Sequence, residues 1–267
     1  MSVINQKQGQ LEYLTAEEIP VPHGFTTRLG GVSTGIFGSL NLGLHRGDDS
    51  ANVAENYHIL ENALGFSKED LVLTWQIHSD IVRVVSRADA GKGYDHRDYP
   101  QCDALVTNTP GVALMVFAAD CTPMLRDDRR TGAVGAAHAG WRGPALGIAQ
   151  KTVQTMVSAF GTRPEDVVAA IGPNIGACCF ETDADVPEAM RSALGQEAEP
   201  YITQKGEKFR VDLKEMNRLW LRRAGVENIT LSESCTACQP DRFWSHRVTQ
   251  GQRGSQGGVI LCKERKI

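Results

Sequence analysis

Three side chains that can bind a metal each stand at the end of an apolar run of the sequence. Residues 133–137 precede His138, and similar runs precede His78 and Cys121. Strand ends are where α/β sheets present ligands and catalytic groups. Two imidazoles and one thiolate supply three ligands of a tetrahedral zinc site and leave a fourth position for water or substrate. The same donors suit copper in a trigonal arrangement, so the ligand types alone do not select the metal.

The spacing of these three residues does not by itself bring them together, because they are not within one turn of a helix. One alternative to a metal site is therefore that the three residues are unrelated to one another. A metal-free hydrolase or amidase is another, with Cys121 as the nucleophile and His138 or His78 as its base. A noncatalytic zinc-stabilised binding module is weaker, because structural zinc sites have four protein ligands.

The elements that would position these residues follow an interleaved pattern. Several predicted strands follow one another through tight turns, which favours mixed sheets with flanking helices in one α/β domain (α+β in some schemes) over residues 21–267. Residues 1–20 are predicted to be a loosely held arm. Strands are predicted at 71–74, 81–85, 103–106, 112–118, 134–138 and 167–171, and helices at 51–64, 144–160, 186–194 and 213–224.

Charge and hydropathy exclude two classes of partner. The chain has 267 residues and a net charge of −4, which gives no general electrostatic case for nucleic acid. Arg126, Arg129 and Arg130 bracket two aspartates and are interpreted as a solvated face. No run approaches the roughly 18 to 20 apolar residues of a membrane span, and the N-terminus lacks the apolar core of a signal peptide. We expect a cytoplasmic protein, and no feature indicates a protein partner.

The chain contains seven cysteines without the spacing of a disulfide framework. In a reducing compartment such cysteines are free thiols or metal ligands. Cys235 and Cys238 have CxxC spacing, but no partner pair lies near them in the sequence, so a second metal site is not expected. Cys178 and Cys179 are interpreted as packing residues.

Eight short motifs occur in order between residue 22 and the C-terminus. They read TRLGGVS (27–33), SLNLG (39–43), QIH (76–78), DALVT (103–107), ADCTP (119–123), HAGWRG (138–143), GPNIG (172–176) and SHR (245–247). With these motifs the chain resembles the YfiH/laccase-domain family, and the ADCTP and HAGWRG pair is highly specific. That family includes proteins described as purine nucleoside phosphorylases with adenosine deaminase activity, as polyphenol oxidases and as peptidoglycan editing factors.

The resemblance implies an α/β sandwich of mixed sheets. It also implies that His78, Cys121 and His138 bind zinc and form the active site, and that Arg28 and Asn41 line the pocket. The expected activity is zinc-dependent phosphorolysis of inosine, adenosine or methylthioadenosine, with adenosine deaminase activity, so that the partners are a purine nucleoside and phosphate. The alternatives are a Cys–His amidase acting on peptidoglycan precursors and a copper-dependent polyphenol oxidase. No His-x-His pair is present, which disfavours a multicopper cluster.

Four residues have expected roles around the metal. Arg28 can hold phosphate in a bidentate manner, which a lysine cannot. Asp120 is a candidate proton shuttle, with a turn cap or a contact that orders His138 as its alternative. Arg247, with its neighbour His246, is a candidate substrate contact. Val248 stands where the family usually has a second arginine, which puts in doubt a phosphate contact at that position.

Overall fold

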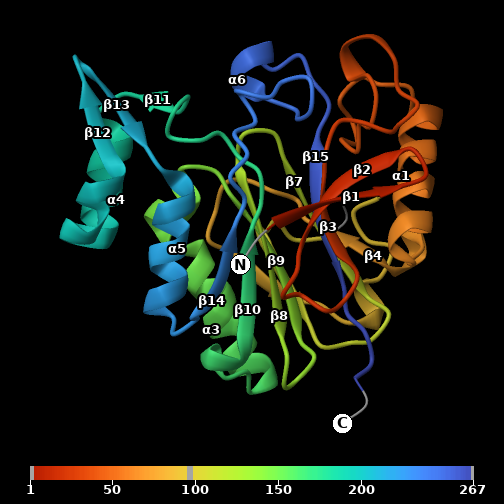
Figure 1. Ribbon diagram of the computed structural model, residues 1–267. Helices are drawn as coiled ribbons and strands as arrows, with labels where there is room; N and C mark the ends of the chain where they lie inside the picture. The colour runs from red at the N-terminus through yellow and green to blue at the C-terminus, as the bar shows by residue number, and fades with distance from the viewer. Residues whose placement is uncertain (1–2, 95–98, 266–267) are drawn as a thin grey trace.

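Two mixed six-stranded sheets form the body of the molecule, as the computed structural model shows for residues 3–94 and 99–265 (Figure 1). The first sheet has the order β1 (Val3–Gln8), β2 (Leu11–Ala16), β3 (His23–Thr26), β15 (Gln256–Leu261), β7 (Ala113–Ala118) and β4 (Leu71–Leu73). The second has the order β14 (Asn228–Leu231), β10 (Val167–Ile171), β8 (Thr122–Asp128), β9 (Val134–Ala139), β6 (Ala104–Thr107) and β5 (Val82–Val84). A third sheet contains only β11 (Glu181–Thr182), β13 (Lys208–Val211) and β12 (Ile202–Lys205).

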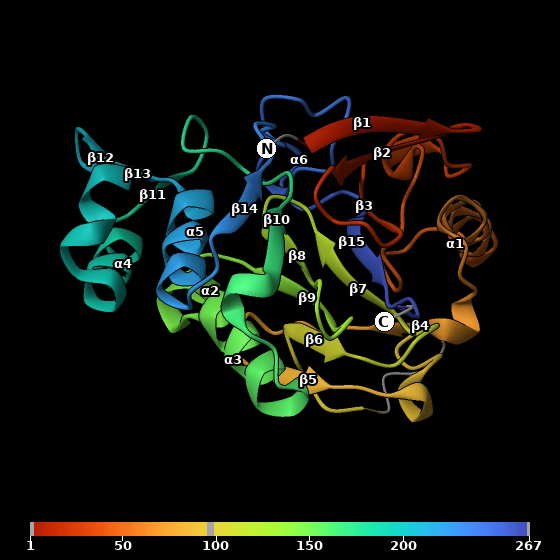
Figure 2. The same ribbon diagram turned by 60° about the horizontal axis from the view of Figure 1, so that its bottom comes forward.

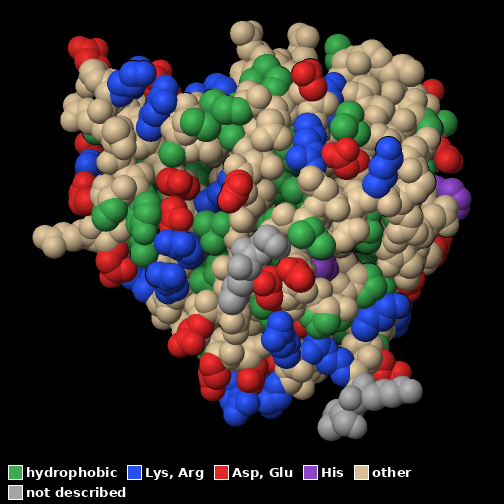
Figure 3. Space-filling model, in the orientation of Figure 1, with side chains coloured by type: hydrophobic (Ala, Val, Ile, Leu, Met, Phe, Trp, Pro, Cys, Tyr) green, Lys and Arg blue, Asp and Glu red, His purple; other side chains and the backbone are tan. Residues whose placement is uncertain are grey.

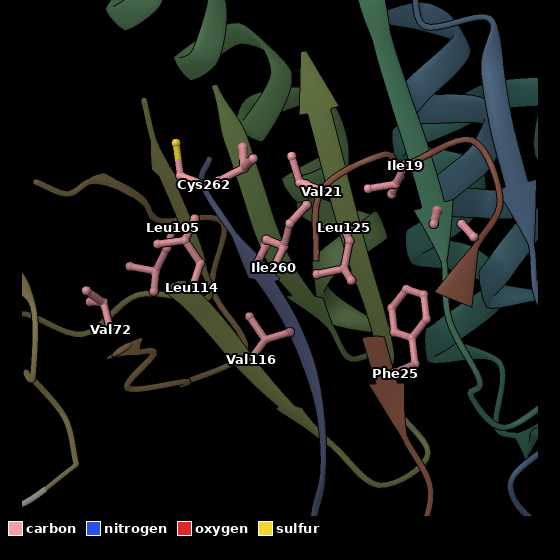
Figure 4. Close-up of a cluster of buried hydrophobic side chains, with 14 of the residues drawn as sticks. Ile19, Val21, Phe25, Val72, Leu105, Leu114, Val116, Leu125, Ile260 and Cys262 are labelled. Atoms are coloured by element: carbon pink, nitrogen blue, oxygen red, sulfur yellow. The ribbon is translucent and has the colours of Figure 1, made fainter. Parts of the chain in front are cut away.

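The inner faces of the two large sheets form the main core. Phe25 and Ile260 of the first sheet belong to the same buried cluster as Leu105 and Leu125 of the second (Figure 4). Strand β7 shows how the sequence produces this arrangement, because alternate side chains of a strand point to opposite faces. Its Leu114 and Val116 belong to this inner cluster, whereas Ala113 and Met115 join the cluster beneath α1. The predicted sandwich of mixed sheets with flanking helices is confirmed.

Helices cover the outer faces of both sheets (Figure 2). The helix α1 (Ser50–Leu64) packs on the first sheet, with Asp49 as its N-cap and Gly65 in the left-handed conformation at its end. The second sheet is covered by α3 (Ile148–Phe160) and α5 (Leu213–Arg223). The helix predicted at 144–160 is two helices, α2 (Arg142–Leu146) and α3, because Gly147 has a φ of 75° between them. The remaining helices are α4 (Asp185–Leu194) and α6 (His246–Thr249).

The prediction of a loosely held arm over residues 1–20 is wrong for most of that segment. Strands β1 and β2 form an antiparallel hairpin at the edge of the first sheet. Leu11 and Leu14 of β2 are buried in the two clusters on either side of this sheet. The segment therefore belongs to the sandwich and contributes to its core.

The interpretation of Arg126 as part of a solvated face is also wrong. Arg126 lies in β8 and is 0% exposed, and its guanidinium donates to the carbonyl oxygen of Ala149 at 3.3 Å. Burial lowers the pKa of Arg126 to about 9. The neighbouring aspartates are buried too, and Arg265 pairs with Asp127. The sequence did not reveal this strand, because its second half consists of charged residues and lacks the apolar pattern of a buried strand.

Two connections between the sheets build one end of the sandwich. The chain leaves β4 in the first sheet and enters β5 in the second through residues 74–81. It passes again from β7 to β8 through residues 119–121. Loops that change sheets must cross the open end of the core, and they place their side chains where both sheets can contribute to one site.

No helix in the described part of the chain is long and apolar enough to cross a membrane. On the face seen in Figure 3, Lys and Arg side chains lie beside Asp and Glu side chains and do not form one continuous basic surface.

Candidate active site

His78, Cys121 and His138 come together where the two connections cross the end of the sandwich. His78 lies in the loop after β4, Cys121 lies between β7 and β8, and His138 is part of β9. One ligand atom from each of the three lies within 4.8 Å of the other two. The two imidazole rings are edge to face, with centroids 4.9 Å apart. His138 is buried, Cys121 is half-buried and His78 is exposed, so the group opens to solvent on one side.

The carboxylate of Asp103 organises two of the three residues. Its Oδ1 accepts a hydrogen bond from Nδ1 of His138 at 2.9 Å, so Nε2 is the nitrogen that could bind a metal once it has lost its proton. The same carboxylate accepts the backbone N–H groups of Ile77, His78 and Ser79, and the hydroxyl of Ser79 at 2.7 Å. Successive N–H groups directed at one anion form a nest, and this one holds His78 at a positive φ of 62°.

The electrostatics of the group favour ionised Asp103 and a strongly basic His138. Burial opposes ionisation of Asp103, but hydrogen bonds from His138 and Ser79 outweigh it and bring its pKa to about 2. Burial would lower the pKa of His138, yet the Cys121 thiol and the Asp103 carboxylate raise it to about 9. The pKa of His78 is lowered, mainly by burial and then by His138. His78 is therefore neutral at pH 7 and ready to bind a metal.

Gly140 provides the space in which the three side chains meet. A Cβ at this position would lie 2.2 Å from Nδ1 of His78 and 3.3 Å from Sγ of Cys121. Any side chain here would push His78 out of the group.

These observations meet the requirements of a metal site with an open position. The donor set of two imidazoles and one thiolate suits zinc, and a carboxylate behind one histidine is the usual outer partner of such a ligand. The side chains converge without an intervening residue. His78, Cys121 and His138 therefore fit a zinc ion.

A cavity of about 380 Å³ opens beside the group. It is lined by Arg46, His78, Ala119, Asp120, Cys121, Ile175, Phe180, His246, Arg247 and Arg253. Its size suits a small organic ligand. Three guanidinium groups and three apolar side chains line this cavity, so it combines a cationic region with an apolar wall.

Arg253 is the most deeply placed cation of the cavity. It is 9% exposed, and its Nη1 donates to the carbonyl oxygen of Gly254 at 2.8 Å and to the hydroxyl of Ser255 at 3.2 Å. Its Nε has no hydrogen-bond partner among the described residues. Burial, and then the nearby Arg46, lower the pKa of Arg253 to about 10, so it stays charged at neutral pH. A buried donor without a partner indicates a place for an acceptor from a ligand.

Asp120 lines the cavity but its carboxylate is already engaged. Oδ1 accepts from the hydroxyl of Thr236 at 2.6 Å, and Oδ2 accepts from Ser245 Oγ at 3.1 Å and from the backbone N–H of Arg247 at 2.7 Å. Asp120 itself has a φ of 81°. It holds the start of α6 in place, and its contacts do not support the predicted proton shuttle. The residue that orders His138 is Asp103.

Arg28 does not have the contacts predicted for a phosphate clamp. Its Nε and Nη2 donate to the carbonyl oxygen of Gly38, and its Nη1 donates to that of Pro240 at 2.8 Å. The guanidinium lies 4.0 Å from the ring centroid of Trp244. All three nitrogens are thus used to join two loops, and Arg28 is not among the residues that line the described cavity.

Asn41 lies behind the pocket instead of lining it. It is 0% exposed, and its Oδ1 accepts the N–H groups of Gly43 at 2.8 Å and Ser255 at 2.9 Å. Its amide donates to Asp48 at 2.9 Å. Asn41 therefore supports Ser255, which lines a smaller cavity that also contacts His78, Cys121 and His138.

Sequence reasoning missed three residues of this site. Asp103 is the first residue of the DALVT motif and of the strand predicted at 103–106, and a carboxylate at the start of an apolar strand was the signal for it. Arg46 and Arg253 lie in polar, glycine-containing segments whose sequence resembles ordinary loops. Only the fold shows that these two arginines, with Arg247, surround one cavity.

Comparison with known proteins gives one consistent result. The family model described as "Multi-copper polyphenol oxidoreductase laccase" matches residues 22–263. The "Purine nucleoside phosphorylase YlmD" of Geobacillus stearothermophilus is 41% identical over 248 residues, which are 90% of each chain. A "Purine nucleoside phosphorylase" of Deinococcus radiodurans is 41% identical over 257 residues, covering 96% of this chain and 95% of that one.

Solved structures agree with the sequence matches. The crystal structure of the Geobacillus stearothermophilus YlmD protein has a TM-score of 0.92 at 37% identity, covering 98% of this chain and all of that one. The YfiH protein of Bacillus licheniformis has a TM-score of 0.91 at 35% identity, covering 97% of this chain and 99% of that one. The motifs, the fold and these matches lead to the same assignment: the chain belongs to the YfiH/laccase family.

Proposed function

We propose that this protein is a zinc-dependent purine nucleoside phosphorylase that also deaminates adenosine. The observation that carries the proposal is the cationic region of the cavity, where Arg253 Nε has no hydrogen-bond partner among the described residues beside the His78, Cys121 and His138 group. Phosphorolysis needs an anion held against the sugar C1 and an environment for the departing purine. Relatives that carry the phosphorylase name are similar to this chain over nine-tenths of its length.

Arg253 and Arg46 are the groups we assign to phosphate. Arg253 is buried and fixed by the bonds from its Nη1 to Gly254 and Ser255, so its remaining donors, Nε and Nη2, have defined directions. Arg46 is exposed at the rim of the cavity. A buried, fixed guanidinium and an exposed one can together hold a phosphate dianion by charge-assisted hydrogen bonds. They also supply the positive charge that the second arginine, replaced here by Val248, would have supplied.

Ile175 and Phe180 form the apolar wall that we assign to the purine. Phe180 is fixed in part by Arg247, whose guanidinium lies 5.8 Å from its ring centroid. Arg247 in turn donates to the carbonyl oxygens of Cys179 and Glu181, at 3.2 and 3.0 Å. Its role is therefore to shape the wall as well as to add charge, and an aromatic ring in this position offers a stacking surface for a base.

His246 is the group that we assign to proton movement. Burial lowers its pKa, and the nearby Arg253 lowers it further, so the imidazole is neutral at pH 7. Its ring makes no hydrogen bond within the described part of the chain, whereas both oxygens of Asp120 are engaged. A neutral imidazole facing the cavity can accept a proton from a nucleophile and return it to a leaving group.

Zinc held by His78, Cys121 and His138 would supply a Lewis acid that polarises an oxygen or lowers the pKa of water. The chain contributes the fixed geometry: Asp103 sets the tautomer and direction of His138, and the nest of N–H groups sets the loop of His78. Deamination at C6 of adenine needs such an activated water and a proton carrier, and it follows the chemistry of other nucleobase deaminases with histidine and cysteine ligands.

A Cys–His amidase and a multicopper oxidase are the two alternative functions of this site. The pairing of Cys121 with His138 also suits a Cys–His amidase acting on peptidoglycan precursors, and the two readings differ in whether the thiolate is shielded by metal. A multicopper oxidase is disfavoured, because among the described residues histidine takes part in only one group that could hold a metal. The family model is described as an oxidoreductase, whereas the relatives carry the phosphorylase name. A single group of two imidazoles and one thiolate favours the phosphorylase.

The test is a product analysis with inosine and adenosine. We expect inosine to yield hypoxanthine and ribose 1-phosphate only when phosphate is present, and adenosine to yield inosine without phosphate. Both reactions should be lost when the metal is removed and return when zinc is restored. Base release that is independent of phosphate, or no base release from any purine nucleoside by zinc-loaded protein, contradicts the phosphorylase proposal.

A further inference from the structure

A second group of metal-binding side chains lies outside the site described above. Cys178, Cys179, Cys235 and Cys238 come together so that their four Sγ atoms lie within 4.8 Å of one another. The expectation that the CxxC pair has no partner, and that Cys178 and Cys179 serve only for packing, is therefore wrong. The partners are far apart in the sequence, and the fold brings the turn at 176–180 against the turn at 235–239.

The spacing of the sulfur atoms is that of ligands around a single ion. Sγ of Cys238 lies 3.5 Å from that of Cys178 and 3.3 Å from that of Cys179. A tetrahedral zinc with Zn–S bonds of about 2.3 Å has sulfur atoms roughly 3.8 Å apart. A disulfide would need about 2.05 Å between sulfurs, and all four thiols are free. The group is also too small to enclose several iron atoms with their bridging sulfides.

The surroundings of Cys235 are those of a metal-bound thiolate. The backbone N–H of Gly176 donates to its Sγ at 3.2 Å, and the backbone N–H of Cys238 also contacts it. The first N–H comes from one turn and the second from the other. In a CxxC turn such N–H groups stabilise the negative charge of the thiolate through hydrogen bonds.

A buried cation lies next to the group and can offset the charge of four thiolates. Lys214 is 8% exposed, and its ammonium donates to the carbonyl oxygen of Ser234 at 2.8 Å, directly beside Cys235. Cys178 and Cys238 are exposed, so an ion can enter from solvent.

We propose that Cys178, Cys179, Cys235 and Cys238 bind one structural zinc ion. A site with four protein ligands and no open position is structural, whereas the site at His78 has one position open. The two sites are therefore different in kind, and the second does not depend on the reaction assigned to the first.

The zinc would fasten one wall of the cavity. Arg247 donates to the carbonyl oxygen of Cys179, and Thr236, next to Cys235, donates to Asp120. The turn at 176–180 also leads into β11, and the turn at 235–239 leads toward α6, in the upper part of Figure 1. Joining the two turns through one ion fixes Phe180 and Arg247 relative to the rest of the sandwich.

The experiment counts zinc in variants that remove one site at a time. Protein is purified under reducing conditions without chelator, and zinc is measured by elemental analysis in the wild type, His78→Ala, Cys238→Ser and the double variant. Cys262→Ser is the matched control, because Cys262 is a buried cysteine whose thiol contacts the carbonyl oxygen of Gly132 and not this group. We expect His78→Ala to keep about one zinc that the double variant loses.

Cobalt substitution and hydrogen exchange give readouts that do not depend on activity. In the His78→Ala background we expect cobalt to give strong thiolate charge-transfer absorption that Cys238→Ser abolishes and Cys262→Ser leaves unchanged. We also expect faster amide exchange at residues 176–181 and 235–243 in Cys238→Ser. Equal zinc in His78→Ala and the double variant, or a disulfide between these cysteines in the freshly purified protein, overturns the proposal. Loss of phosphorolysis alone would not, because it concerns the other site.

Discussion

Nδ1 of the His138 imidazole lies 2.9 Å from Oδ1 of Asp103, and both side chains are buried at the end of the sandwich. The same carboxylate also binds the N–H groups of the loop that carries His78. One acidic residue outside the His78, Cys121 and His138 group therefore sets the positions of two imidazoles, one in the loop after β4 and one in β9.

Replacing Asp103 by Asn should weaken zinc binding about 10- to 100-fold, because it removes the acceptor that orders His138 and the anion that the N–H nest holds. Zinc affinity is measured by competition with a chromogenic chelator. Asp80→Asn is the matched control, since Asp80 forms an ion pair with Lys151 nearby on the surface. Equal zinc affinity in Asp103→Asn and the wild type would contradict this role of the carboxylate.

Gly140→Ala should displace His78 and reduce zinc occupancy, because the new methyl group would lie 2.2 Å from Nδ1 of His78. Overpacking of this kind costs about 1–3 kcal/mol. Gly135→Ala is the control: it lies in β9, five residues before Gly140, and its new methyl group would have no neighbour nearer than 3.4 Å. Zinc content and thermal unfolding are measured for both variants. Full zinc content in Gly140→Ala shows that the cavity for His78 is wider than described.

Arg253→Lys should raise the KM for phosphate about 10- to 100-fold, since a hydrogen bond to a charged group contributes roughly 1.5–3 kcal/mol. Arg28→Lys should leave that KM unchanged and lower the free energy of unfolding by about 1–2 kcal/mol, because it loses contacts to Gly38, Pro240 and Trp244. Steady-state kinetics with inosine and urea denaturation separate the two effects. The reverse result would restore Arg28 as the phosphate clamp.

Zinc binding should strengthen as the pH rises. The pKa of His138 is raised to about 9 in the metal-free protein, so its ring carries a proton at pH 7 that zinc must displace. Below that pKa the affinity should fall by about tenfold for each unit of pH through His138 alone. His78, whose pKa is lowered, adds no such requirement near neutral pH. Chelator competition across the range from about pH 6 to pH 8 measures the slope, and a flat profile would contradict the protonated state of His138.

Cys121 should react slowly with iodoacetamide in zinc-loaded protein and faster after chelation, because a metal-bound thiolate is shielded. Mass spectrometry of the peptide that contains Cys121 follows the reaction, and the exposed thiols are counted separately. Cys121→Ser should lose zinc, phosphorolysis and deamination together. Fast modification of Cys121 with zinc present, together with an acyl adduct from an amide substrate, would favour the amidase instead.

More of this site could be predicted from residues that follow apolar runs of the sequence than from residues in polar, glycine-containing segments. His78, Cys121 and His138 could be proposed because each follows an apolar run and belongs to a specific motif, and the fold does bring them together. The role of Asp103 could not be derived, since a carboxylate before a strand has many possible partners and its actual ones lie in two other segments.

Long-range contacts account for the residues whose surroundings differ from those predicted. Arg28 belongs to a glycine-rich loop of the kind that approaches ligands, but its partners Pro240 and Trp244 lie near the other end of the chain. Arg126 occurs in a charged stretch that predicts solvent exposure, yet β8 lies in the interior of the second sheet with strands on both sides. Neither local periodicity nor local charge carries information about such neighbours.

The residues proposed to hold zinc come from both halves of the sandwich, since the loop of His78 leaves the first sheet and His138 belongs to the second. Neither sheet alone contains a binding site. A chain that has folded only one sheet, or has paired the two incorrectly, would therefore have no place for the ion. The zinc content of a preparation would therefore measure the fraction of molecules in which both sheets are folded and correctly packed. A folding error far from the cavity would lower that zinc content.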